Sequence, residues 1–177
     1  MKGGKGENPG LRRLIEQVFS RHGDRLSPVR YHARNFASLI QEADPFIQES
    51  TGKVCPKCEH VCCINKHSYH THFDVLYLRA LGETVPSHMK GIADSKPCQF
   101  LSPGGCRLRR SLRPYRCTWY FCTPLLEHIR NTPARRYRAF ISCLEQISLE
   151  REVLLAAFLG IARETGFTAA ISPHDFY

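Results

Sequence analysis

Cysteines constrain this chain more than any other residue, because eight of its nine fall between positions 55 and 122. They form two groups of four: Cys55, Cys58, Cys62 and Cys63, then Cys98, Cys106, Cys117 and Cys122. The second group is too widely spaced to form a compact knuckle alone. The fold must therefore bring the two groups together, and a metal bound by both would hold two distant segments of the chain in contact.

The first group has the spacing of a metal site. Between Cys55 and Cys58 stand two residues, which lets one short turn direct two thiolates at one ion, as in zinc and iron–sulfur sites. Cys62 and Cys63 are adjacent, and adjacent side chains of an extended segment point in opposite directions. Both reach one ion only if the chain bends sharply there, so we expect one of them to ligate more directly.

Free cysteine also serves as a small hydrophobic core residue. The clustered eight lie among Pro, Lys, Gly and Arg in loop-like sequence, where core usage is not expected. Cys143 instead lies within a long apolar helical pattern. We therefore interpret the eight as metal ligands and Cys143 as a core residue.

Composition is that of one folded domain over residues 1–177, with 42% hydrophobic and 23% charged residues. The N-terminus lacks the apolar stretch of a secretory signal. The richest apolar run, residues 153–162, is half the roughly 20 residues that a membrane span needs. We expect a cytoplasmic protein without a membrane partner, whose thiols bind metal and do not pair as disulfides.

Hydrophobic periodicity predicts helices before the cysteines. Apolar residues recur at helical spacing from Leu11 to Phe19. Ser27 followed by Pro28 is typical of a helix start, and Pro45 is expected to end that second helix. The sequence therefore predicts N-terminal helices over residues 11–45.

Further helices are predicted after the first cysteine group. A short helix is expected from His72 to Leu81, capped by Thr71 and ended by Gly82. Residues 83–118 carry mostly turn signals, and residues 133–165 form a helical segment of one helix or two. We expect a mainly α fold, a small single domain whose loop-rich, cysteine-ligated centre at 55–122 packs against helices.

The two cysteine groups together resemble the signature of the YkgJ-type cysteine-cluster (CxxCxxCC) family, whose members are described as chelating zinc or iron. The family's Cys-x-Phe-Leu is matched at residues 98–101 and its Arg-Pro-x-x-Cys at residues 113–117, with Cys106 between them. The leading CxxCxxCC is matched with one extra residue before Cys62. The resemblance covers residues 55 to about 122 and implies a metal centre of eight cysteines, beside which we expect Arg113 to bind the cofactor.

The identity of the metal stays open, since zinc and a cubane cluster both take four cysteines. A larger protein with the same cysteine pattern, the flagellin lysine methylase, is linked to an iron–sulfur cluster and S-adenosylmethionine. This resemblance favours a [4Fe-4S] cluster over zinc and leaves an S-adenosylmethionine-dependent methyltransferase-like enzyme as an alternative. Imidazoles, which zinc accepts readily, are near, although we interpret them as surface residues: His60, His67, His70 and His72.

The net charge of +9 includes five arginines within one ten-residue stretch: Arg107, Arg109, Arg110, Arg113 and Arg116. Guanidinium groups offset the negative charge of a thiolate centre. They also suit a small anionic ligand, bound bidentately, or the phosphates of a nucleic acid in a metal-stabilised binding module. We do not expect nucleic acid as a partner, because the nearby aromatic run is typical of a core: Tyr115, Trp119, Tyr120 and Phe121.

Overall fold

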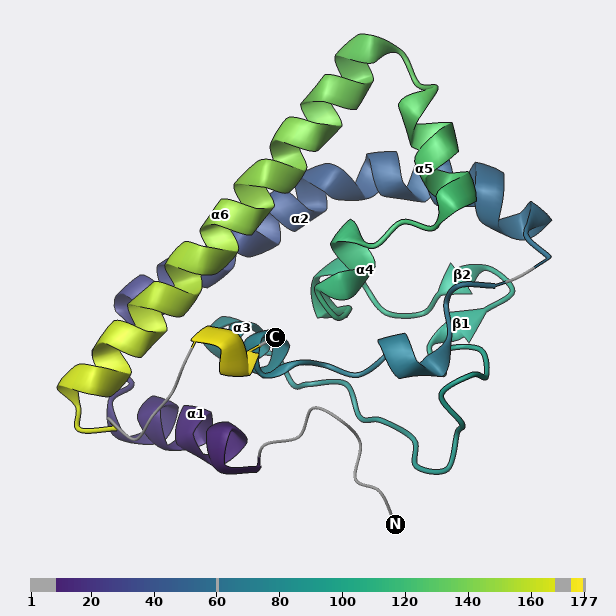
Figure 1. Cartoon of the computed structure of the whole chain (residues 1–177). Helices are drawn as coiled ribbons and strands as arrows, with labels where there is room; N and C mark the ends of the chain where they lie inside the picture. Colours follow the sequence, from purple (N-terminus) through teal and green to yellow (C-terminus); the bar gives the residue numbers. More distant parts are fainter. Residues whose placement is uncertain (1–8, 60, 168–172, 177) are drawn as a thin grey trace. The chain divides into compact units, whose positions relative to one another are not determined.

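The computed structural model describes residues 9–59, 61–167 and 173–176. Helices dominate these residues, which confirms the predicted mainly α fold class. The chain divides into two compact units: Met1–Phe36 with His70–Val85 and Leu149–Tyr177, and Ala37–Tyr69 with Pro86–Ser148. The long helices α2 (Ser27–Val54) and α6 (Ala134–Glu164) contribute residues to both (Figure 1). None of the described helices combines the length and apolar character that crossing a membrane requires.

The first unit is an aromatic-rich helical core without cysteines. Helix α1 (Pro9–Arg21) packs on α3 (His72–Leu81), and α3 also contacts the short turn η4 (Pro173–Phe176). The ring of Phe36 meets those of Phe73 and Tyr77 edge-on, at centroid distances of 5.4 and 4.9 Å. These contacts hold the first part of α2 against α3.

Helix α3 has the predicted bounds. The Thr71 hydroxyl accepts a hydrogen bond from the backbone N–H of Asp74, whose carboxylate accepts one from the Thr71 N–H at 2.7 Å. Gly82 follows the helix with φ +76°, a left-handed conformation that glycine adopts without strain. Local signals therefore define this helix at both ends.

The predicted end of the second helix at Pro45 is wrong, because α2 continues through Pro45 to Val54. Proline removes one backbone donor, but the apolar face of the helix continues beyond it, with Ala43 and Ile47 both buried. Burial of that face outweighs the missing hydrogen bond. As a result α2 ends directly before Cys55.

The second unit contains the remaining short elements. The helical segment predicted at residues 133–165 is the single helix α6 (Ala134–Glu164), and Gly166 lies just beyond it with φ +84°. Helix α5 (Thr123–Arg130) was not predicted. The Phe140 ring stacks on Phe46 at 4.2 Å and lies 5.8 Å from Phe121, which packs α6 against α2 and the segment before α5.

Candidate metal centre

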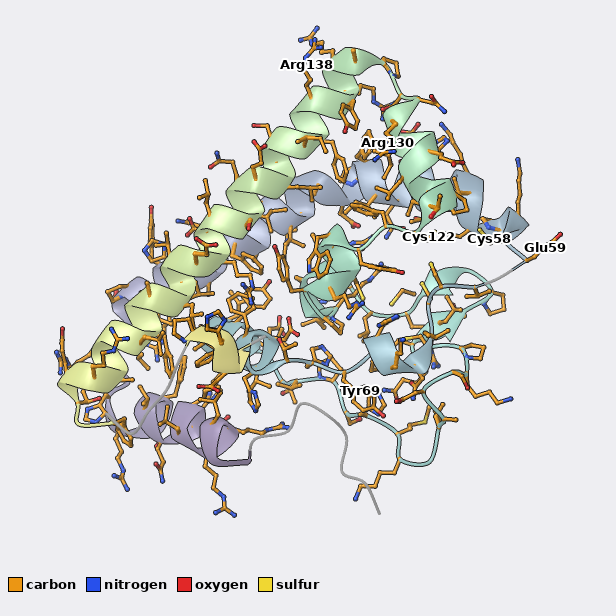
Figure 2. All side chains as sticks on the ribbon, viewed as in Figure 1. Cys58, Glu59, Tyr69, Cys122, Arg130 and Arg138 are labelled. Carbon is orange, nitrogen blue, oxygen red and sulfur yellow. The ribbon has the colours of Figure 1, made fainter. Side chains whose placement is uncertain are left out.

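The end of α2 presents the first two cysteines. A single 3₁₀ turn, η1 (Cys55–Lys57), follows the helix, with Pro56 in its first turn. The Cys58 N–H donates to the Cys55 carbonyl at 3.2 Å, and the Cys58 thiol donates to the Val54 carbonyl at 3.6 Å. Figure 2 labels Cys58 at this end of α2. The two-residue spacing thus forms the tight turn that was predicted for it.

Backbone hydrogen bonds join the end of the first cysteine group to the start of the second. The Cys98 N–H donates to the Cys63 carbonyl at 2.9 Å, and Ile64 forms an antiparallel bridge with Pro97. The Asn65 N–H extends this pairing to the Lys96 carbonyl at 2.7 Å. Cys63 and Cys98 are therefore held beside each other, although 34 residues separate them in sequence.

A buried polar network holds this pairing in place. Asn65, in the turn η2 (Asn65–His67), has no exposed surface, and its side-chain amide donates to the Ile92 carbonyl at 3.1 Å. Its side-chain oxygen accepts from the buried Ser68 hydroxyl at 3.1 Å and from the Gln99 N–H at 3.4 Å. Satisfied buried polar groups specify one arrangement of loops that have little regular structure.

A two-stranded hairpin places Cys106. The strands β1 (Leu101–Ser102) and β2 (Gly105–Cys106) are antiparallel, with Leu101 opposite Cys106 (Figure 1). The Leu101 N–H also donates to the Cys98 carbonyl at 2.8 Å. The hairpin therefore folds Cys106 back toward Cys98.

A buried ion pair anchors the segment that carries Cys117. The Arg110 Nε, in the turn η3 (Arg110–Leu112), donates to the Asp44 carboxylate of α2 at 2.6 Å, and the Arg110 side chain is only 5% exposed. The same guanidinium donates to the Cys117 carbonyl at 3.0 Å, in the one-turn helix α4 (Arg116–Trp119). Cys122 then precedes α5, and its carbonyl accepts from Leu126 N–H at 2.9 Å.

Thiols of both groups are neighbours within the second unit. Cys62 hydrogen-bonds with Cys122 and interacts electrostatically with Cys55. Cys55 in turn interacts with Cys63, Cys58 and Cys122. Cys122, a member of the second group, thus interacts with two thiols of the first group.

A second set of contacts extends from Cys63. Its thiol interacts with those of Cys98 and Cys106, and it hydrogen-bonds with Cys62. Cys117 interacts with Cys106 and Cys63. All eight predicted ligands therefore belong to one connected network of side chains.

The environment of the network favours neutral thiols in the absence of a cation. Burial, followed by the neighbouring thiols, raises the pKa of Cys55 to about 11 and that of Cys62 to about 12. Burial, then Cys106 and Cys63, raises the pKa of Cys117 to about 12, although Arg110 and Arg113 act to lower it. When these thiols lose their protons, the resulting thiolates repel one another, and a bound cation relieves that repulsion.

The donor set fits a thiolate-binding metal by its chemistry. Thiolates are the ligands that zinc and iron–sulfur clusters share, and Cys55 and Cys63 keep surface open to solvent through which a metal can enter. In the described part of the chain, no three or more His, Cys, Asp or Glu side chains are arranged so that they could hold an ion as they stand. A metal bound by these thiols would have to draw them inward.

The arginines of residues 107–116 have separate contacts. The Arg113 Nε donates to the Leu108 carbonyl at 2.9 Å, and its charge acts to lower the pKa of Cys63 and Cys117. Arg107 donates to the Gln99 carbonyl at 2.6 Å. Arg113 therefore lies where a positive charge reduces the cost of an anionic thiolate centre, and its role as a cofactor-binding residue stays a prediction.

The histidines and Cys143 have other surroundings. His67 packs against Tyr120 at 5.6 Å, and its Nδ1 is buried without a hydrogen-bond partner among the described residues. His72 belongs to the first unit, where it donates to the Asp175 carbonyl at 3.2 Å. His60 lies outside the described residues. Cys143 is partly buried, and its thiol donates to the Leu39 carbonyl at 3.6 Å.

Two of the aromatic residues expected in the core lie at the surface. Trp119 is 48% exposed and Tyr120 is 39% exposed. Helix α4 is a single turn that buries Thr118, and Phe121 packs on Phe140, so the side chains between them point outward. The Arg116 guanidinium lies over both rings, 5.9 Å from Trp119 and 5.1 Å from Tyr120.

Comparisons with known proteins find no match among protein-family models, curated proteins or solved structures. The resemblance to the YkgJ-type family therefore stays a prediction, carried by the cysteine pattern.

Proposed function

We propose that this chain is a metal-binding protein of the YkgJ type, in which the two cysteine groups bind an iron–sulfur cluster or zinc. The observation that carries the proposal is the network of eight thiols within one unit. Cysteines that served only as small core residues would not gather across 34 intervening residues on loops rich in Arg, Lys, Gly and Pro.

The surroundings of the thiols support the same function. Asn65 and the Asp44–Arg110 ion pair fix loops that little regular secondary structure holds. Arg110 and Arg113 bring positive charge to Cys117, which suits ligands that bind as thiolates. A bound zinc would close the loops structurally, whereas an iron–sulfur cluster would add electron transfer.

The proposal is tested by an absorption spectrum and metal analysis of protein purified without oxygen. An iron–sulfur cluster gives broad absorbance at about 400 nm with iron and sulfide in equal amounts, and zinc gives a colourless protein that retains the metal. A folded protein that stays free of both after reconstitution with each metal contradicts the proposal.

A second candidate function, binding of single-stranded nucleic acid, is favoured by the surface at Trp119. The expectation against nucleic acid depended on burial of the aromatic run, and Trp119 and Tyr120 are exposed. Arg116 lies over both rings. Burial, followed by the charges of Arg116 and Lys66, lowers the pKa of His67, which packs against Tyr120, so two cations lie near these rings. Exposed rings beside cations stack bases and attract phosphates.

Intrinsic fluorescence tests this second function, because Trp119 is the only tryptophan of the chain. A single-stranded oligonucleotide is expected to quench it, with affinity that falls as salt rises. Arg116→Gln should weaken binding more than Arg12→Gln, which removes the same charge from α1 in the first unit. An unquenched tryptophan at low salt, or equal weakening by the two variants, contradicts binding at this surface.

A further inference from the structure

We propose that the eight cysteines form two four-cysteine metal sites that meet at the Cys62–Cys63 pair. The proposal rests on the function proposed above and adds the number of sites and the ligands of each. The first site takes Cys55, Cys58, Cys62 and Cys122. The second site takes Cys63, Cys98, Cys106 and Cys117.

The first argument is the number of donors. One zinc ion or one cubane cluster takes four cysteines, so eight converging thiols exceed the capacity of a single centre. A single site would leave four thiols beside it without a ligand role. Two sites use every member of the network.

The second argument is which thiols are neighbours. The Cys62 thiol hydrogen-bonds with Cys122 and interacts electrostatically with Cys63 and Cys55. The Cys63 carbonyl accepts from the Cys98 N–H, and the hairpin partner of Cys106, Leu101, donates to the Cys98 carbonyl. The Cys63 thiol interacts electrostatically with Cys98 and Cys106. The two sets are joined by the interaction between Cys62 and Cys63, and Cys55 also interacts with Cys63.

The third argument is the backbone at the pair. The Ile64 N–H donates to the Cys62 carbonyl at 2.9 Å, which closes a tight turn centred on Cys63. The Cys63 carbonyl then accepts from the Cys98 N–H, whereas the Cys62 thiol hydrogen-bonds with that of Cys122. The turn therefore divides two adjacent thiols between different partners, and the expected bend does not direct both toward one set.

The division differs from the order of the sequence. The structure assigns Cys122, a member of the second group, to the site at the end of α2, and Cys63, a member of the first group, to the hairpin site. Figure 2 labels Cys58 and Cys122, the members of the first site contributed by the end of α2 and the start of α5. Each site thus joins both segments of the chain.

Metal content of paired variants tests the proposal. Wild type is expected to bind about two zinc ions, or twice the iron and sulfide of one cluster. Cys58→Ser combined with Cys122→Ser alters one site only and should retain half of the metal. Cys58→Ser combined with Cys98→Ser alters both sites and should retain none, and Cys143→Ser is the control that keeps the full amount.

Each other outcome overturns the assignment. Wild type with a single zinc or a single cluster per chain means that one site exists, while the proposed function still stands. If the Cys58/Cys122 double variant loses all of its metal and a Cys98/Cys122 double variant retains half, each site consists of one of the two groups defined by the sequence. Wild type without metal removes the proposed function as well.

Discussion

Removal of the metal is expected to unfold the loops of residues 55–122 while α1 and α3 keep their structure. Binding of a structural metal contributes about 10–16 kcal/mol in small zinc domains, which is comparable to the whole stability of a typical domain, about 5–15 kcal/mol. The loops contain little regular secondary structure that could compensate, because β1 and β2 have two residues each. The first unit has an aromatic core and no cysteine.

Hydrogen exchange, followed by mass spectrometry before and after chelation, measures this effect. The amides of Asn65 and Cys98, which donate across the two segments, should lose protection. Amides within α3 should change little, since that helix is capped by its own residues. Unchanged protection at Asn65 and Cys98, in protein shown to be free of metal, would contradict a structural role for the metal.

The elements that were predicted correctly are those whose signals are local. Thr71, Asp74 and Gly82 define α3 within twelve residues of sequence, so its bounds follow from capping and from the left-handed glycine. Pro45 is a local signal that failed, because burial of Ile47 continues the helix through it. The sequence does contain a local signal for the start of helix α5, because Pro124 lies in its first turn and proline is favoured there.

The candidate ligands could be predicted from spacing, but the contacts that gather them could not. Asn65 and Gln99 are ordinary polar residues in the sequence. Only the fold shows that both are buried and that the Gln99 N–H donates to the Asn65 side-chain oxygen. Asp44 and Arg110 are likewise distant in sequence. Such pairs leave no periodic pattern, since either residue alone is typical of a solvated surface. The outward direction of Trp119 was missed for a similar reason, because an aromatic run does not reveal which side of a single helical turn faces solvent.

Asp44→Asn is expected to lower the free energy of unfolding by roughly 3–5 kcal/mol, because it leaves the buried Arg110 guanidinium without a counter-charge. The Arg110 side chain is 5% exposed and that of Asp44 is 30% exposed, so water cannot replace the lost carboxylate efficiently. Burial already lowers the pKa of Arg110, while Asp44 acts to raise it. Since Arg110 also bonds to the Cys117 carbonyl, metal should be lost at a lower chelator concentration.

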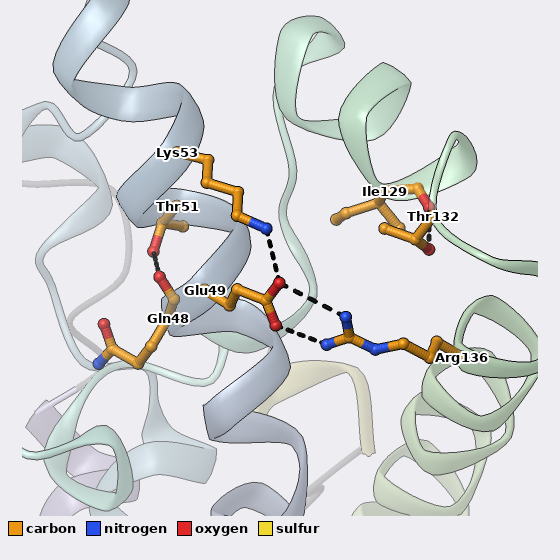
Figure 3. Close-up of polar contacts among 7 residues, drawn as sticks. All are labelled: Gln48, Glu49, Thr51, Lys53, Ile129, Thr132 and Arg136. Atoms are coloured by element: carbon orange, nitrogen blue, oxygen red, sulfur yellow. Dashed lines mark hydrogen bonds and ion pairs between the residues drawn. The ribbon is translucent and has the colours of Figure 1, made fainter.

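Chemical denaturation of metal-loaded protein measures the change, and an exposed ion pair between α2 and α6 is the control. Glu49 of α2 accepts from Lys53 at 2.6 Å and from Arg136 at 2.5 Å, with all three side chains at least 40% exposed (Figure 3). Arg136→Gln should change stability far less than Asp44→Asn, because water screens that pair. The double variant Asp44→Leu with Arg110→Met should recover much of the loss, since it buries no unpaired charge. Equal effects of Asp44→Asn and Arg136→Gln would mean that the Asp44–Arg110 pair does not anchor the cysteine loops to α2.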